Sequence, residues 1–263
     1  MTKGAIFVTV RSGSSRLPGK ALMEIKGKST IQRVIERALE ACVTDLVVVC
    51  TTTLPEDDQI CEIAKRCGAK VFRGSVSDKL LRWLGAAHMY GVDYFITADG
   101  DDLFCDPKLN DLALHQLRNG SADFIQSSRV IPGAFTYGIR TSALEKVCEI
   151  KASDDTEMMW VYFTQTGLFK IEELAGDLSP YVRDNVRITL DYQEDFDFFV
   201  RVFDSLYDLY PSMPLIKVLE YLDANPNVAA INLFFNNVWS ANQIEKTQLV
   251  LKPQYQYLIK KKE

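Results

Sequence analysis

The chain has 263 residues, of which 47% are hydrophobic and 25% are charged, and its formal net charge at pH 7 is −5. These proportions are ordinary for a globular protein, and the negative balance excludes the basic surface that binds nucleic acids or anionic membranes. No stretch approaches 18 apolar residues, so we expect no transmembrane helix. The six cysteines form no C-x-x-C pair, which is typical of reduced cytoplasmic thiols, and the presence of only two histidines argues against a zinc site or a histidine-based triad.

The first predicted element is a strand over the apolar residues 4–10, and the loop RSGSSRLPGK follows at residues 11–20. This loop has neither the Walker A spacing nor G-x-G-x-x-G, because five residues separate its first glycine from the Gly-Lys pair. It still offers backbone amides and three cations, Arg11, Arg16 and Lys20, which suit a polyphosphate. The alternative is a solvated loop with ordinary surface charge.

Helix and strand patterns then alternate to the end of the first hundred residues. The expected elements, in order, are a helix over residues 31–39, a buried strand over 45–52, a helix from 57 or 58 to 67, a strand over 69–74, a helix over 77–90 and a strand from 92 that ends in the acids of ADGDD. Repeated strand–helix units of this kind imply a mainly parallel sheet with helices on both faces.

Ligands bind such sheets beyond the carboxyl ends of the strands. This rule places four loops along one rim: residues 11–20, 51–53, 73–78 and 99–102. The last loop contains Asp99, Asp101 and Asp102, whose hard oxygen atoms suit Mg²⁺ or Mn²⁺ held partly through substrate phosphates. The alternative for these acids is a turn in which carboxylates accept backbone hydrogen bonds.

The second half of the chain is less regular. Its expected elements are helices over residues 142–149 and 154–164, a strand near 168–172, a strand over 187–190, an amphipathic helix from about 194, a helix over 215–224 and a partly ordered tail from 252. The sequence shows no clean domain boundary, so we expect a single domain over residues 1–263. Its last part, residues 211–263, is expected to be helical.

Five spaced motifs occur in the order seen in a known family: RSGSSRLPGKAL, VVVCTT followed by DD, VFRGS, DGDD followed by DP, and VRITLDYQED. Through them the chain resembles the SpsF-like group of cytidylyltransferases over roughly residues 4–210. That group is similar to the enzymes that make CMP-activated 3-deoxy-manno-octulosonate and sialic acids. The resemblance implies an α/β, Rossmann-like nucleotidyltransferase fold of the GT-A-like kind, with a mixed, mostly parallel sheet and helices on both faces.

The activity that the resemblance implies is transfer of CMP from CTP to a small acceptor, with release of pyrophosphate. The acceptors left open are a 2-keto sugar acid, a sugar or polyol phosphate, a phosphonate-like compound and another phosphorylated metabolite. The implied setting is surface polysaccharide biosynthesis by a cytoplasmic homodimer, with Mg²⁺ as the cofactor and Mn²⁺ as an alternative. The less regular elements within residues 125–185 are expected on the acceptor side or at the dimer interface.

The resemblance also implies roles for individual residues. The implied catalytic residues are Lys20, Arg16 and Asp101. The implied nucleotide contacts are Arg11, Ser12, Gly13, Arg16, Lys20, Thr51, Arg73, Ser75 and Asp101. The implied metal ligands are Asp101 and Asp191, with weaker claims for Asp99 and Asp102. Glu157 and Arg187 are implied to contact the acceptor. The segments GDDLF and DDTEMMW depart from the family's sequences on this side, so the identity of the acceptor stays open.

Recognition of the cytosine base is expected from backbone groups at the ends of two strands, near residues 51–53 and 73–75. Two other functions are compatible with the sequence. A sugar-nucleotide glycosyltransferase would explain the D-x-D sequence of Asp99 and Asp101, although the basic loop suits a triphosphate better than the diphosphate of such a donor. A non-catalytic nucleotide-binding subunit would need neither Asp101 nor Asp191, yet both are present.

Overall fold

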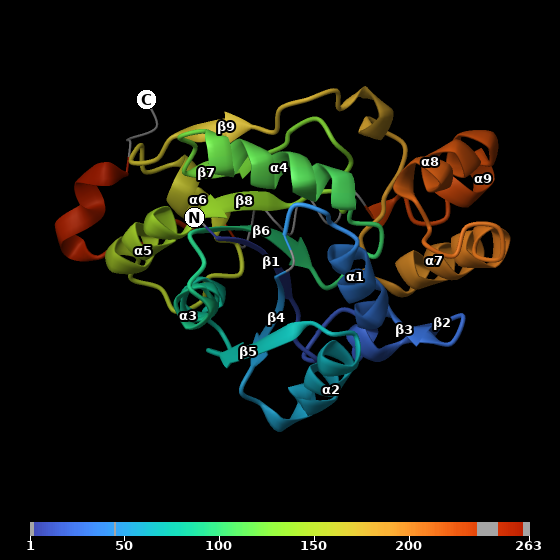
Figure 1. Ribbon diagram of the computed structural model, residues 1–263, viewed down its shortest axis with the longest axis horizontal. Coiled ribbons are helices and arrows are strands. Elements are labelled where there is room, and N and C mark those ends of the chain that lie inside the picture. The colour runs from blue at the N-terminus through green and yellow to red at the C-terminus, as the bar shows by residue number, and fades with distance from the viewer. Residues whose placement is uncertain (1–2, 45, 236–246, 260–263) are drawn as a thin grey trace.

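The computed structural model describes residues 3–44, 46–235 and 247–259, which form an α/β fold around a seven-stranded sheet (Figure 1). The strands are β1 Gly4–Thr9, β4 Val47–Thr52, β5 Lys70–Gly74, β6 Tyr94–Asp99, β7 Phe124–Gln126, β8 Tyr137–Arg140 and β9 Ile171–Glu173. Their order in the sheet is β5-β4-β1-β6-β8-β7-β9. The first four strands of that order are parallel, whereas β8 runs antiparallel to both β6 and β7. The predicted mixed, mostly parallel sheet is therefore confirmed.

Helices cover both faces of this sheet (Figure 1). They are α1 Thr30–Leu39, α2 Asp58–Arg66, α3 Lys79–Tyr90, α4 Pro107–Asn119, α5 Thr141–Ile150, α6 Trp160–Thr164, α7 Gln193–Leu206, α8 Leu215–Ala224 and α9 Pro226–Ala229. Side chains of β1 alternate between the faces: Ile6 and Val8 pack in the cluster that holds α1, α4 and α7, and Ala5 and Phe7 pack in the cluster that holds α3, α5 and α6. Burial on both faces explains why the parallel strands read as continuous apolar runs.

Short elements complete the fold. They are the hairpin strands β2 Glu24–Ile25 and β3 Lys28–Ser29 and the short 3₁₀ helices η1 Lys20–Leu22, η2 Pro55–Asp57, η3 Ser179–Tyr181 and η4 Pro253–Leu258.

Polar caps fix where the helices of the first half begin. The Ser29 hydroxyl accepts a hydrogen bond from the Gln32 amide (3.3 Å) at the start of α1, and the Asp78 carboxylate accepts one from the Leu81 amide (3.0 Å) at the start of α3. Such side chains satisfy amides that have no partner inside the helix. Helix α3 ends at Gly91, whose φ of 63° suits a residue without a side chain. Local signals therefore define this part of the fold.

The predicted strand over residues 187–190 is wrong. The segment is extended and its apolar side chains are buried, but within the described residues no strand pairs with it along a ladder. One backbone hydrogen bond, from the Leu190 amide to the Asp101 carbonyl (2.9 Å), ties it to the turn after β6. Packing against this turn buries the segment, so an apolar run here does not signal a strand.

The predicted helix over residues 154–164 is also wrong for its first part, because only α6 is helical. The Ser153 hydroxyl donates to the Asp155 carbonyl (2.9 Å) and accepts from the Asp155 amide (3.1 Å). Local bonds of this kind compete with helix formation. Residues 151–159 therefore form a loop.

Among the described residues of the C-terminal part, the named helices are α8, α9 and η4. Residues 250–252 are extended instead: the Ala152 amide donates to the Val250 carbonyl and the Lys252 amide to the Ile150 carbonyl, both at 2.9 Å. These bonds attach the segment to the end of α5. The remaining residues of the predicted helical part, 236–246 and 260–263, lie outside the described residues. Across the part of the chain that the structure describes, no helix has the length and apolarity needed to cross a bilayer.

Gly133 offers a test of the packing around the extended segment. Its φ is 96°, and a Cβ atom added there would lie 2.6 Å from the Ile188 carbonyl oxygen. We predict that Gly133→Ala lowers the free energy of unfolding by about 2 kcal/mol or more, because a strained backbone is combined with a clash against backbone. The matched control is Gly27→Ala, which has a φ of 74° but no atom within 4 Å and should lose only about 1 kcal/mol. Urea denaturation measures both, and equal losses would contradict the prediction.

Candidate active site

A cleft of about 690 Å³ opens beyond the carboxyl ends of β1 and β6. The chain crosses from β1 to β4 and β5 on one side and then returns to the other side of β1 as β6. Ligands of open α/β sheets bind at such a reversal of strand order. The lining comes from the loop after β1, the start of α3, the turn after β6, residues 127–137, residues 157–160, and the extended segment at Thr189 and Asp191.

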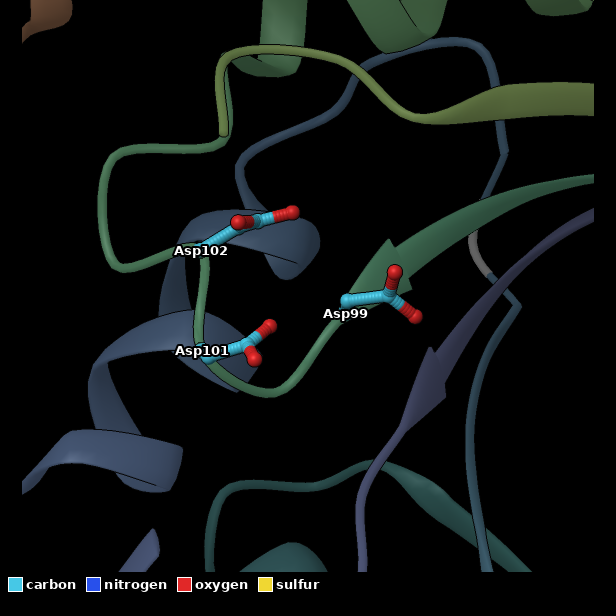
Figure 2. Close-up of side chains that lie close together, drawn as sticks. All are labelled: Asp99, Asp101 and Asp102. Atoms are coloured by element: carbon cyan, nitrogen blue, oxygen red, sulfur yellow. The ribbon is translucent and has the colours of Figure 1, made fainter. Parts of the chain in front are cut away.

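Three carboxylates meet at the turn after β6. Figure 2 shows Asp99, Asp101 and Asp102 projecting from the same side of this turn, and each offers an oxygen atom within 4.8 Å of the others. Burial raises the pKa of Asp101 and Asp102, and repulsion among the acids raises it further. The Lys79 ammonium partly balances this charge, since it lies 3.0 Å from Asp99 Oδ1. These oxygen atoms form the hard donor set that the sequence predicts.

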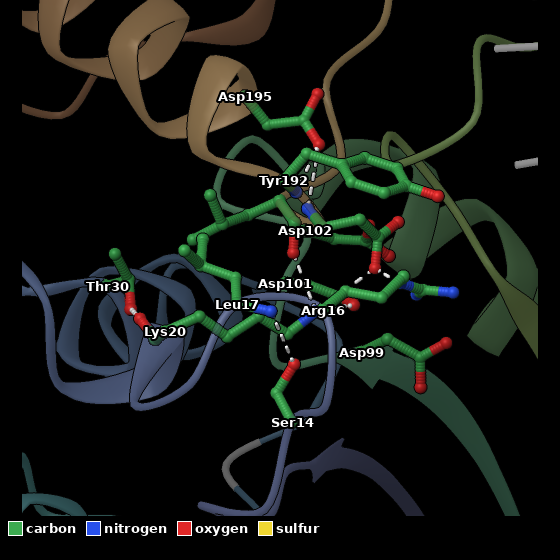
Figure 3. Close-up of polar contacts among 12 residues, drawn as sticks. Ser14, Arg16, Leu17, Lys20, Thr30, Asp99, Asp101, Asp102, Tyr192 and Asp195 are labelled. Atoms are coloured by element: carbon green, nitrogen blue, oxygen red, sulfur yellow. Dashed lines mark hydrogen bonds and ion pairs between the residues drawn. The ribbon is translucent and has the colours of Figure 1, made fainter. Parts of the chain in front are cut away.

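Lys20 brings the first loop to these acids. Its Nζ donates to Asp101 Oδ2 (2.7 Å), Asp191 Oδ1 (3.2 Å) and the Leu190 carbonyl (2.6 Å) (Figure 3). Burial lowers the pKa of Lys20, but the two carboxylates raise it by more, so the net shift is upward. The side chain is 16% exposed. Two aspartates far apart in sequence therefore contact one ammonium group.

Asp191 is held by cations on both of its oxygen atoms. Arg16 donates to Oδ1, and Arg187 Nη2 donates to Oδ2 at 3.0 Å. Burial opposes ionisation of Asp191, but Lys20, Arg16 and Arg187 outweigh it and lower the pKa. This carboxylate stays ionised inside the protein because it is surrounded by positive charge.

Asp195 fixes the backbone that carries Asp191. Its Oδ2 accepts from the amides of Asp191 (2.8 Å) and Tyr192 (2.9 Å), which starts helix α7 with a capping arrangement (Figure 3). Its Oδ1 accepts from Arg187 Nε (2.9 Å) and Asn232 Nδ2 (2.8 Å). The aspartate at the fourth position after Asp191 is therefore a supporting residue.

Several predicted site residues line the cleft. They are Arg11, Gly13, Arg16, Lys20, Asp101, Asp191 and Glu157. Arg11 also connects two walls, since its Nη2 lies 3.4 Å from Glu157 Oε2 and its Nη1 donates to the Val76 carbonyl (3.2 Å). The structure thus gathers residues from the whole length of the resemblance, and their roles in binding and catalysis stay predictions.

Four predicted nucleotide contacts do not line the cleft and support its walls instead. The Ser12 amide donates to Asp57 Oδ1 (2.7 Å), and the buried Thr51 hydroxyl donates to Asp57 Oδ2 (2.9 Å). The Arg73 guanidinium is bound by Asp58 and by the carbonyls of residues 52 and 54. The Ser75 hydroxyl accepts from the Asp78 amide (3.1 Å).

Arg187 does not face an acceptor in this structure. Its side chain is 1% exposed and lies behind Asp191, paired with Asp191 and Asp195. The predicted acceptor contact is therefore corrected to a role in holding Asp191. The charge pattern alone could not separate the two, because an arginine four residues before an aspartate suits either.

Sequence reasoning missed other lining residues. Among them are Lys79, Arg82, Tyr137, Trp160 and Thr189. Lys79 and Arg82 lie at i and i+3 on α3 and so share a face, directly after the rim loop 73–78. That spacing was available in the sequence. Tyr137 lies on the four-residue strand β8, which is too short to show the alternation of apolar and polar residues that predicts a strand.

Known proteins resemble this chain in sequence. A family model described as cytidylyltransferase matches residues 5–203. The spore coat polysaccharide biosynthesis protein SpsF of Bacillus subtilis is 22% identical over 230 residues, which cover 85% of this chain and 95% of that protein.

Solved structures share the fold. A cytidylyltransferase from Leptospira borgpetersenii aligns with a TM-score of 0.79 at 28% identity and covers 88% of this chain and 98% of that one. The CMP:2-keto-3-deoxy-manno-octonic acid synthetase complexed with CTP aligns with a TM-score of 0.60 at 19% identity, over 78% of this chain and 99% of that one. The latter likeness shows the fold alone.

The Asp195 network gives a stability prediction. Asp195→Asn should lower the free energy of unfolding by about 3 kcal/mol or more, because it removes one partner of a buried ion pair and leaves Arg187 undercompensated. The control is Asp197→Asn, an exposed aspartate on the same helix, which should change stability by at most about 0.5 kcal/mol. Urea denaturation of both variants is the measurement. Equal stability of the two variants would mean that Asp191 is held without Asp195.

Proposed function

Since this chain belongs to the cytidylyltransferase family, we propose that it transfers CMP from CTP to a phosphorylated small molecule or a sugar acid and releases pyrophosphate. The observation that carries this proposal is the meeting of Lys20 and Arg16 with Asp101 and Asp191 at the edge of the cleft. The name of the Bacillus subtilis relative supports a role in polysaccharide biosynthesis. The CTP in the solved synthetase supports the choice of nucleotide.

The donor set fits a divalent metal ion. Asp101 and Asp191 both contact the Lys20 ammonium, so their oxygen atoms can reach one cation, and Asp99 and Asp102 add further oxygen atoms nearby. Carboxylate oxygen atoms without histidine favour Mg²⁺ or Mn²⁺. When bound, such an ion would supply charge neutralisation at the phosphates and the acceptor oxygen. We propose Asp101 and Asp191 as its main ligands.

The proposed reaction leaves little covalent work to the protein. An acceptor oxygen forms a bond to the α-phosphorus, the bond from that phosphorus to the bridging oxygen breaks, and pyrophosphate leaves with the electron pair. Arg11, Arg16 and Lys20 would bind phosphate oxygen atoms and neutralise the charge that develops there. In this proposal, Lys20 and Arg16 release the carboxylates of Asp101 and Asp191 and bind phosphate oxygen atoms instead.

The lining also bears on the acceptor. No histidine occurs among the described residues that line the cleft. A phosphorylated acceptor carries an anionic oxygen atom and needs no strong general base. We therefore favour a sugar phosphate, a polyol phosphate or a related phosphorylated metabolite, bound near Glu157 and Tyr137.

Nucleotide turnover tests the function directly. We expect pyrophosphate release with CTP and Mg²⁺ in the presence of a matching acceptor, and a product heavier than the acceptor by one CMP group, seen by mass spectrometry. UTP, ATP and GTP should give much slower release. Turnover of a UDP-sugar without pyrophosphate release would instead support the glycosyltransferase.

Lys20 gives a test of the charge-neutralising role. Lys20→Ala should lower kcat/KM for CTP by about a hundredfold or more, the scale of losing one preorganised electrostatic contact. Because Lys20 is largely buried against two acids, some loss of stability is expected as well, so the assay is run well below the melting temperature of the variant. The control is Lys65→Ala, an exposed lysine outside the cleft, which should keep full activity. Near-normal turnover in Lys20→Ala would contradict the assignment.

A further inference from the structure

Arg82 is a buried arginine at the wall of the cleft that lacks a carboxylate partner. It lies on α3, is 4% exposed and lines the cleft. Its Nη1 donates to the Ser75 carbonyl (2.7 Å), whereas its Nε is buried and has no hydrogen-bond partner. Among the described residues no acid lies within ion-pair distance of it. Burial lowers the pKa of Arg82, as expected for a charge that is poorly compensated.

Two other buried arginines of this chain differ from Arg82. Arg37 donates to the carbonyls of Cys105 (2.8 Å), Ser212 (2.7 Å) and Met213 (2.9 Å). Arg33 also has an unpartnered Nε, but its guanidinium lies 4.1 Å from the ring centroid of Phe203 and does not line the cleft. Leaving donors of a buried guanidinium unpaired is costly. Arg82 combines an unpaired donor and the absence of an ion-pair partner among the described residues with a place in the lining of the cleft, which indicates a partner that comes from the ligand.

The position of Arg82 suits the base of a nucleotide. Its partner Ser75 follows β5, and the neighbouring Val76 carbonyl binds Arg11 of the first loop. The acids follow β6, and β4 and β1 lie between β5 and β6 in the sheet. Three strand spacings separate the two ends by about 14 Å. A nucleotide with its phosphates at the first loop and its α-phosphorus near the acids therefore has room for its base on the side of Arg82.

We propose that Arg82 is the residue that selects cytosine, by donating two N–H groups to the N3 and O2 atoms of the base. The inference rests on the proposed function. These two atoms are adjacent acceptors, and a guanidinium presents donors in a matching planar fork. Uracil carries a hydrogen on N3, so a donor would face a donor there. This proposal assigns base recognition to a side chain, whereas the sequence predicts backbone groups near residues 51–53 and 73–75; the variants below distinguish the two.

Calorimetry with four probes tests this role, with Mg²⁺ present and acceptor absent. The probes are CTP, UTP, 3-deaza-CTP, which lacks the N3 acceptor, and inorganic tripolyphosphate. The unmodified protein should bind CTP about tenfold or more tighter than UTP or 3-deaza-CTP, the scale of leaving a buried polar group unpaired. In Arg82→Met the three nucleotides should bind with nearly equal affinity. Tripolyphosphate affinity should stay within about twofold, because the contact is to the base and not to the phosphates.

Two further variants make the outcome unambiguous. Arg82→Lys keeps the charge but loses the fork, and should also lose the preference for CTP over 3-deaza-CTP. Arg201→Met, at an exposed arginine of α7 away from the cleft, should behave like the unmodified protein. Thermal denaturation checks that each variant is folded. If Arg82→Met does not fold, the lysine variant and the 3-deaza probe carry the test.

The contrary results separate the two proposals. A preference for CTP over UTP that survives in Arg82→Met and Arg82→Lys would overturn the role of Arg82 and leave the cytidylyltransferase proposal intact. A parallel loss of tripolyphosphate affinity would make Arg82 a phosphate contact and overturn base selection. An unmodified protein that binds another nucleoside triphosphate more tightly than CTP would contradict the proposed function itself.

Discussion

A buried carboxylate among cations organises this molecule. Asp191 is 1% exposed, and it stays ionised because Arg16, Lys20 and Arg187 surround it. Arg16 and Lys20 join the loop after β1 to the extended segment that carries Arg187 and Asp191, and Lys20 also reaches Asp101 in the turn after β6. An unpaired charge at this depth would be strongly destabilising, so the three pieces must assemble together. The geometry of the cleft is a consequence of that requirement.

The same charge balance bears on the proposed function. In the structure, Lys20 and Arg16 are neutralised by Asp101 and Asp191, so these cations are held in place at the edge of the cleft before any ligand arrives. On the proposed function, phosphate oxygen atoms would compete with the carboxylates for the same donors. The released carboxylates would then be available to a divalent cation, whose charge would offset the negative charge that the phosphates bring.

Sequence patterns predict the first half of the fold well, because its signals are local. Caps such as Asp78 and the apolar runs of the parallel strands act within a few residues, and the rule for strand ends then places Arg16, Lys20 and Asp101 on one rim. The failures have a different physical origin. The extended segment at residues 187–190 is buried by a turn far away in sequence, and no local pattern distinguishes this from a ladder. Side-chain direction also depends on distant residues: Arg73 and Arg82 flank the same turn, but Arg73 is bound by Asp58 and by the carbonyls of residues 52 and 54, and only Arg82 lines the cleft.

The two walls of the cleft are coupled through one carboxylate. Asp78 caps α3, which carries Arg82, and also accepts from Thr156 Oγ1 (2.9 Å) and from the buried Lys151 ammonium. Lys151 and Thr156 belong to the loop that leads to Glu157 and Trp160 on the opposite wall. The start of α3 and that loop therefore cannot move independently without breaking a buried ion pair, which is a costly change. The parallel-sheet half and the irregular half are thus tied together by Asp78, so we expect substitutions at Lys151 or Thr156 to act on the start of α3 through this contact.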